Sequence, residues 1–195
     1  EIQDITEIVK DKTDFNIFNN AEVVKCLVVE GKADWSRKDF EELEELAKEK
    51  GAKGLAYTKV ENGELGSGIA KFVNEISESI IEETNAKEGD ALLFMADEWE
   101  LSCKALGHLR KILGKRLELA NEDELAFVWV KDFPFYEKSE ETGELDFGHN
   151  PFSMPKGGMK AFDTDDPYSI VSRQYDLALN GYEMLSGSIR NHDPE

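Results

Sequence analysis

Three times between Ala21 and Leu113, a short apolar run is followed by a longer run whose apolar residues have helical spacing. Short β-branched and apolar runs are typical of strands, and apolar residues three or four positions apart give a helix one face to bury. This alternation predicts helices packed on a small sheet, in a module of about 100 residues. The strand-like runs are residues 23–29, 55–60 and 91–96, and the helix-like runs are residues 40–47, 69–80 and 101–112.

The pattern changes near Asn121. From Ala126 onward, prolines, aromatic residues and turn signals replace the helical spacing, and residues 127–130 and 145–147 are typical of strands in hairpins. We therefore expect an α+β fold in two domains. Residues 1–121 are predicted to form an α/β domain with helices on a small sheet, and residues 122–195 to form part of an antiparallel sheet.

Composition narrows the class of protein. With 40% hydrophobic residues the chain can bury a core, and it has no apolar run near the roughly 20 residues needed to cross a bilayer. The net charge is −19, so the chain as a whole should repel RNA, which is bound through Lys and Arg. Cys26 and Cys103 have no Cys-x-x-Cys spacing and are expected to be reduced thiols of a cytoplasmic protein. No membrane partner is expected.

The pair Asn180-Gly181, with alternating residues on both sides, predicts a hairpin with a two-residue type I′ turn. Counting outward from this turn pairs Ala178 with Glu183, and Asp176 with Leu185. Asp176 and Glu183 then lie on one face as diagonal neighbours. Two carboxylates on one face repel each other unless a cation lies between them, and hard oxygen ligands suit Mg²⁺ accompanied by phosphate.

Two points in this hairpin stay open. An Asp and a Glu near a turn can also be simple solvent-facing residues, with no ligand at all. In addition, strict alternation places Ser186 and Arg190 on the face away from Glu183. Their joint use with Glu183 requires a β-bulge, which Ser186-Gly187 could provide.

At this point the sequence resembles bacterial-type aspartyl-tRNA synthetases. Three blocks, at residues 127–135, 148–156 and 175–190, follow the order and spacing of that family. Residues 51–57, 71–72, 89–90 and 113–114 resemble the inserted GAD domain, which these synthetases share with tRNA-dependent amidotransferases. The resemblance implies a GAD-like domain in residues 1–121 and part of a class II catalytic domain in residues 122–195. The chain would then be a fragment of the enzyme and inactive alone, because two arginine-bearing family motifs and the anticodon-binding barrel have no counterpart in it.

The resemblance implies a ligase that activates L-aspartate with ATP, with Mg²⁺, and transfers the aspartyl group to tRNA. The parent enzyme would be a cytoplasmic homodimer. Asp176 and Glu183 match metal-binding positions, and Glu183 also matches an ATP-binding position. Ser186 matches a hydroxyl that helps to hold Mg²⁺ in synthetases of the archaeal and eukaryotic kind. Arg190 matches the arginine that binds the side-chain carboxylate of aspartate, and His149 matches a histidine that closes over the amino acid. No residue of the chain is assigned a catalytic role.

The sequence departs from the family in two places. Asn150 stands where many members have a second histidine, and Leu185-Ser186-Gly187 replaces a run of three glycines. The alternative function is a non-catalytic module that positions tRNA or a subunit, as in the amidotransferases. The block from Asp176 to Arg190 discriminates between the two, because a free-standing module has no use for it.

Overall fold

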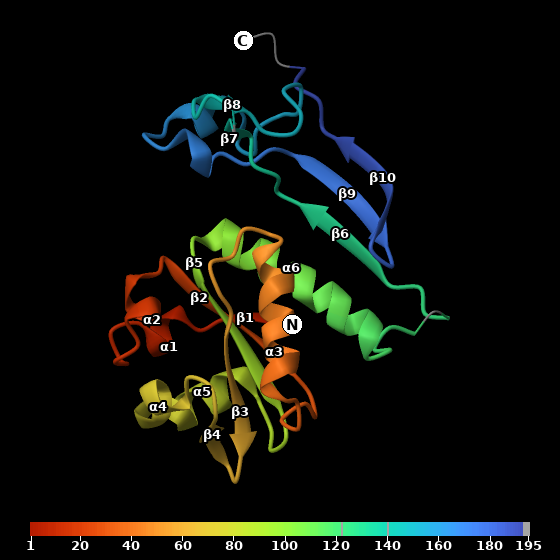
Figure 1. Cartoon of the computed structure of the whole chain (residues 1–195). Coiled ribbons are helices and arrows are strands. Elements are labelled where there is room, and N and C mark those ends of the chain that lie inside the picture. The colour runs from red at the N-terminus through yellow and green to blue at the C-terminus, as the bar shows by residue number, and fades with distance from the viewer. Residues whose placement is uncertain (122, 140, 193–195) are drawn as a thin grey trace. The chain divides into compact units, whose positions relative to one another are not determined.

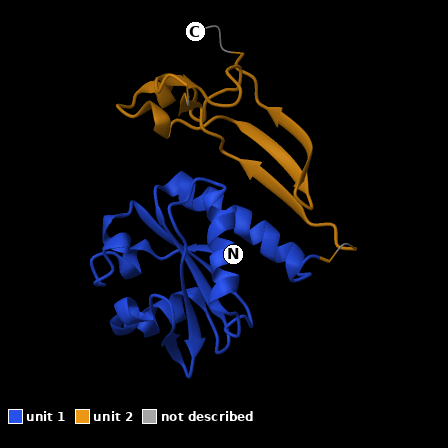
Figure 2. Ribbon diagram, in the orientation of Figure 1, with its two compact units in different colours: residues 1–120 blue, residues 121–195 orange. Residues whose placement is uncertain are grey.

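The computed structural model describes residues 1–121, 123–139 and 141–192. The chain forms two compact units, residues 1–120 and residues 121–195, which are drawn in different colours in Figure 2. The expected domain boundary falls between residues 121 and 122, and Glu122 lies outside the described residues.

Unit 1 is built on a five-stranded sheet with the order β1-β2-β5-β3-β4. Each of its strand pairs is antiparallel, and β5 pairs with β2 along seven residues, from Ala91↔Val29 to Asp97↔Val23. The central strands therefore carry continuous apolar runs, because both of their faces are covered. The strands are β1 (Ile2–Asp4), β2 (Val23–Val29), β3 (Ala56–Glu61), β4 (Glu64–Gly66) and β5 (Ala91–Asp97).

Helices cover the two faces of this sheet, as Figure 1 shows. On one face, α3 (Arg37–Lys48) and α6 (Trp99–Arg116) pack on Leu27, Leu93 and Met95. On the other face, side chains of α1 (Thr6–Val9), α2 (Asn16–Asn20), α4 (Ala70–Val73) and α5 (Ser77–Thr84) pack on Cys26 and Phe94. Alternate residues of one strand thus serve two separate cores, which confirms helices packed on a small sheet.

Residues 69–80 differ from the single helical run that their spacing predicts. They form α4, a 3₁₀ turn η1 (Asn74–Ile76) and then α5, with Asn85 in the left-handed conformation after α5. The Oγ of Ser77 accepts the backbone N–H of Leu65 at 3.0 Å, which ties the start of α5 to the edge strand β4. The apolar residues still face the core, because a tighter turn keeps residues three apart on one side.

Asp4 joins three parts of unit 1 and should make its stability depend on pH. Its carboxylate accepts the N–H and hydroxyl of Thr6 at 3.0 and 2.6 Å, and it pairs at 2.9 Å with the Nζ of Lys25, a side chain only 9% exposed. Partial burial raises the pKa of Asp4, but these partners outweigh it and hold the pKa below the ordinary 3.8. A depressed folded-state pKa gives stability that is present above pH 4 and lost as pH falls through the folded pKa.

We therefore predict that Asp4→Asn destabilises unit 1 by about 1 kcal/mol at pH 7, since it leaves the Lys25 ammonium without its charge partner. The difference from the unsubstituted chain should shrink as pH falls below the ordinary pKa of 3.8, because Asp4 is protonated first in the unfolded chain and then, at lower pH, in the folded one. Urea unfolding of both proteins at pH 7 and near pH 3 measures this. Equal differences at the two pH values would contradict it.

Unit 2 contains a three-stranded sheet with the order β10-β9-β6 and a separate two-stranded hairpin of β7 and β8. Every pair of strands in these sheets is antiparallel, as the hairpin signals predict. Short 3₁₀ turns, η2 (Gly158–Phe162) and η3 (Pro167–Ser169), precede β9. The strands are β6 (Phe127–Lys131), β7 (Tyr136–Lys138), β8 (Leu145–Phe147), β9 (Gln174–Leu179) and β10 (Tyr182–Ser188).

The described helices do not include one with both the length and the apolar character of a membrane span.

Cys26 is buried and Cys103 partly buried, and both are free thiols. Burial raises the pKa of the Cys26 thiol, which keeps it protonated and unreactive.

Candidate functional site

The turn that joins β9 to β10 has the predicted form. Asn180 and Gly181 both have positive φ, at 51° and 85°, and Leu179 pairs with Tyr182 across the turn. Positive φ at both central residues defines a type I′ turn, which suits the right-handed twist of the strands. The side-chain oxygen of Asn180 also accepts the N–H of Ala126 at 2.8 Å, so the turn is tied to the segment before β6.

The pairing beyond the turn differs from regular counting. Glu183 pairs with Ala178, and the next paired residue on β10 is Leu185, opposite Leu177. Met184 is therefore an extra residue, which makes a β-bulge. The predicted pairing of Asp176 with Leu185 is wrong, because the bulge moves Ser186 into the place opposite Asp176.

This bulge brings Ser186 to the same face as the two acidic residues. Asp176 and Ala178 are two positions apart on β9 and share a face, so their partners Ser186 and Glu183 share it as well. The Ser186 hydroxyl donates to Oδ1 of Asp176 at 2.8 Å. We call Asp176, Glu183 and Ser186 the hairpin acid face.

The bulge lies at Met184 and not at Ser186-Gly187, where the sequence suggested it could form. Gly187 stays in register opposite Tyr175, on the other face of the hairpin. A Cβ at Gly187 would lie 2.8 Å from ring atoms of Tyr175, so this ring lies directly across the glycine. The Tyr175 ring also contacts Trp129 of β6 edge to face, with 5.9 Å between centroids. This aromatic packing fixes the register of β10 beyond the bulge.

Arg190 lies two residues beyond Ser188, which is the last residue of β10. Ser188 pairs with Gln174, two positions before Asp176 on β9. It forms an isolated bridge with Ser153, and its guanidinium carbon is 4.2 Å from the centroid of the Phe152 ring. Within the described residues, no ion pair engages this guanidinium. Its N–H donors therefore remain available for a planar anion, which a guanidinium can bind through two parallel hydrogen bonds.

His149 lies away from the hairpin in the chain, two residues after β8, and its side chain is exposed. Its ring stacks on Phe133 with 5.9 Å between centroids. The structure thus brings Asp176 and Ser186 into direct contact and places Glu183 on their face. It shows no direct contact of His149 with them.

Comparison with known proteins gives a family match within unit 1 and relatives that match the whole chain. The model of the GAD domain matches residues 16–106, which lie within unit 1. Over 100% of its length, the chain is 41% identical to the aspartate–tRNA(Asp/Asn) ligase of Chlorobium chlorochromatii. It is 44% identical to the aspartate–tRNA ligase of Enterococcus faecalis and 43% identical to that of Streptomyces avermitilis, again over its whole length.

The chain is similar over its whole length to bacterial aspartate–tRNA ligases. It spans about a third of the length of these curated relatives, 33% or 34% in each of the three. The matched region includes the hairpin acid face and Arg190 together with the GAD domain. The whole length of the chain, and not the GAD domain alone, is thus shared with the ligases.

The hairpin acid face offers only oxygen ligands. In the part of the chain that the structure describes, no group of three or more His, Cys, Asp or Glu side chains could hold a metal ion. Two carboxylates and one hydroxyl are too few for a site made of protein alone. They fit Mg²⁺, which keeps several waters and is bound by one or two carboxylates together with phosphate oxygens of a substrate.

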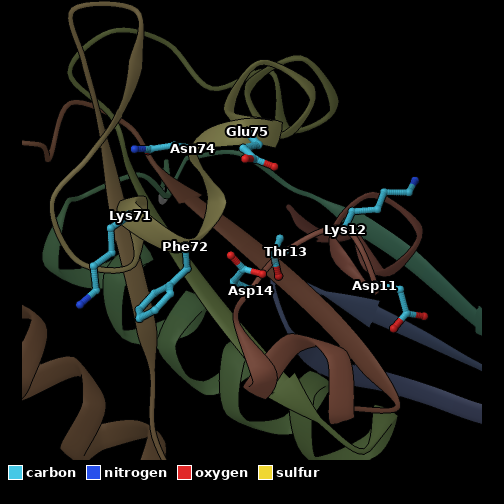
Figure 3. A pocket seen from close by; sticks show the side chains of 8 residues that line it. All are labelled: Asp11, Lys12, Thr13, Asp14, Lys71, Phe72, Asn74 and Glu75. Carbon is cyan, nitrogen blue, oxygen red and sulfur yellow. The ribbon is translucent and has the colours of Figure 1, made fainter.

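A hollow of about 330 Å³ on unit 1 does not form a comparable site. It is lined by residues 11–14 of the loop between α1 and α2 and by residues of α4 and η1, and its side chains include acids, lysines and Phe72. Figure 3 shows Lys12 and Lys71 pointing in opposite directions, away from the hollow. Polar groups that do not converge cannot together hold one ligand, so we assign it no role.

Sequence reasoning missed Gln174. Its side chain is 3% exposed, and it lies on the face of Asp176, two residues earlier on β9. The sequence does contain a sign of this placement, because residues 174 and 176 are two positions apart on a strand and therefore share a face, whereas Tyr175 lies on the other face. This spacing alone does not mark a functional residue, because a glutamine at the start of a strand is usually an ordinary surface residue.

Proposed function

We propose that this chain is a segment of an enzyme that activates L-aspartate with ATP and transfers the aspartyl group to tRNA. Residues 1–121 would be its GAD domain, and residues 122–195 part of its class II catalytic domain. The single observation that carries the proposal is the hairpin acid face, where Asp176, Glu183 and Ser186 lie together because of the Met184 bulge. The activity is proposed for the full-length parent, a cytoplasmic homodimer, and not for the 195-residue chain alone.

The proposed reaction joins two anions, the α-carboxylate of aspartate and the α-phosphate of ATP. Such a reaction needs charge neutralisation and positioning more than covalent help from the protein. Asp176, Glu183 and Ser186 would hold Mg²⁺, and Glu183 would also contact ATP. The metal would supply charge stabilisation at the phosphate oxygens. Arg190 would bind the side-chain carboxylate of aspartate, and His149 would close over the bound amino acid.

The alternative, a non-catalytic module that positions tRNA or a subunit, is not favoured. The chain matches ligases along its whole length, including the hairpin that such a module would not need. The net charge of −19 on the chain as a whole gives no support for direct binding of tRNA through its phosphates.

Aspartate-dependent ATP–pyrophosphate exchange by the full-length parent tests the proposed function. Arg190→Lys in that enzyme should raise the KM for aspartate by about 10- to 100-fold, the size of one lost hydrogen bond to a charged group. A lysine keeps the charge but cannot donate the two parallel hydrogen bonds of a guanidinium. The KM for ATP should stay unchanged.

Two results would contradict this. Absence of aspartate-dependent exchange in the unsubstituted parent would refute the activity itself. A normal KM for aspartate in Arg190→Lys, with exchange otherwise intact, would remove the two-hydrogen-bond role of Arg190.

A further inference from the structure

Unit 2 contains three buried polar side chains whose polar atoms have no hydrogen-bond partner among the described residues. They are Gln174, Ser153 and Ser172, at 3%, 1% and 2% exposure. In Gln174 both the amide oxygen and the amide nitrogen lack a partner. Buried polar groups are nearly always hydrogen-bonded, so a buried amide with neither atom satisfied points to a group from outside the chain.

The position of Gln174 relates it to the proposed site. It pairs with Ser188 across the hairpin, next along the same face after the pair Asp176 and Ser186. The order along this face is therefore Glu183, then Asp176 with Ser186, then Gln174 with Ser188. Arg190 follows two residues after Ser188. Along this face, Gln174 thus lies between two proposed sites. On one side are Asp176 and Glu183, proposed to hold Mg²⁺ and ATP, and on the other is Arg190, proposed to bind the aspartate side chain.

One short segment of unit 2, residues 153–155, pairs with the residues just before β9 and just after β10. Ser153 bridges to Arg190 and Pro155 bridges to Ser172, so residues 153–155 run between the segments before β9 and after β10. The backbone of Met154 accepts from Arg173 and donates to Ile189, both at 2.8 Å. This segment leads directly from the one that carries His149.

A primary amide can accept through its oxygen and donate through its nitrogen. The ligand group that uses both is one with a hydrogen-bond donor beside an acceptor, and an α-amino acid has an α-ammonium next to an α-carboxylate. We propose that Gln174 is a substrate-binding residue that hydrogen-bonds this end of the bound amino acid. The inference rests on the proposed function, and it adds a residue that neither the sequence nor the family resemblance indicated.

Gln174→Leu in the full-length parent tests the proposal, because leucine has a similar volume and no polar atoms. The KM for aspartate in ATP–pyrophosphate exchange should rise by about 10- to 100-fold, as expected for a lost hydrogen bond to a charged group. The KM for ATP should stay within about twofold. Gln3→Leu is the matched control, since Gln3 is in unit 1 and also has an amide oxygen without a partner. It should leave both KM values unchanged.

Thermal unfolding of the 195-residue chain separates a binding role from a structural one. Gln174→Leu should melt at the same temperature as the unsubstituted chain or a few degrees higher, because it removes an unsatisfied buried amide. An unchanged KM for aspartate overturns the proposal. So does a variant that melts lower and loses affinity for aspartate and ATP equally, since that identifies a structural residue. Both results leave the proposed activity standing, which only the unsubstituted parent can refute.

Discussion

Asp176→Ala in the full-length parent should lower aspartate-dependent ATP–pyrophosphate exchange by about 10²- to 10³-fold. Losses of this size follow removal of one preorganised electrostatic contact to a transition state. Glu183→Ala should cause a loss of the same order, because both carboxylates lie on the face proposed to hold Mg²⁺ and ATP. Asp176→Asn should be nearly as defective as the alanine variant. Asparagine can still accept the Ser186 hydroxyl, but it lacks the negative charge that a metal needs.

The control for these variants is Glu137→Ala. Glu137 is an exposed acid of the same unit, on β7 and outside the three-stranded sheet, so its loss should leave exchange within about twofold. Asp176 is only half-buried and Glu183 is exposed, so the 195-residue chain should melt at the same temperature with either substitution. If Asp176→Ala retained exchange within tenfold of the parent, the hairpin acid face would not be the metal and ATP site.

The strands of unit 1 show how far sequence reasoning reaches. β2, β3 and β5 lie within one residue of their predicted limits, because central strands covered on both faces carry unbroken apolar runs. β1 and β4 were not predicted. Each is three residues long and owes its strand form to pairing with β2 or β3, which no local pattern encodes. The break of residues 69–80 into α4, η1 and α5 likewise depends on a tertiary contact, between Ser77 and β4.

The candidate site was predictable only in part, for a related reason. The turn at Asn180-Gly181 is a local property, because these two residues accept positive φ readily. The position of the bulge is not local. It depends on the Tyr175 ring, which lies across Gly187 and against Trp129 of a distant strand, and so holds the far end of β10 in register. Met184 has no feature that marks it as the extra residue.

Two single-residue deletions in β10 should have opposite outcomes because of this bulge. Deleting Met184 removes only the extra residue, so Leu185 still pairs with Leu177 and Ser186 with Asp176. Exchange by the parent should then fall by no more than about tenfold, through the change in local twist. Deleting Gly187 shifts part of β10 by one residue, and a one-residue shift turns side chains to the other face.

After deletion of Gly187, the shortened β10 can pair with β9 in two ways, either without the Met184 bulge or with it, and both pairings damage the site. If the bulge is lost, Leu185 comes to lie opposite Asp176, and Ser186 takes the place where a Cβ has no room beside Tyr175. If the bulge stays, Ser188 moves into that place instead, and Arg190 turns away from the hairpin acid face. We therefore expect exchange to fall by about 100-fold or more, the effect of a lost preorganised contact.

Aspartate-dependent ATP–pyrophosphate exchange by these two deletion variants, measured side by side in the full-length parent, is the most direct test of the claim that the register of β10, with Ser186 opposite Asp176, assembles the site. The claim predicts near-normal exchange without Met184 and little or none without Gly187, with both variants folded by circular dichroism. Equal activity of the two variants, or greater activity without Gly187, would contradict it.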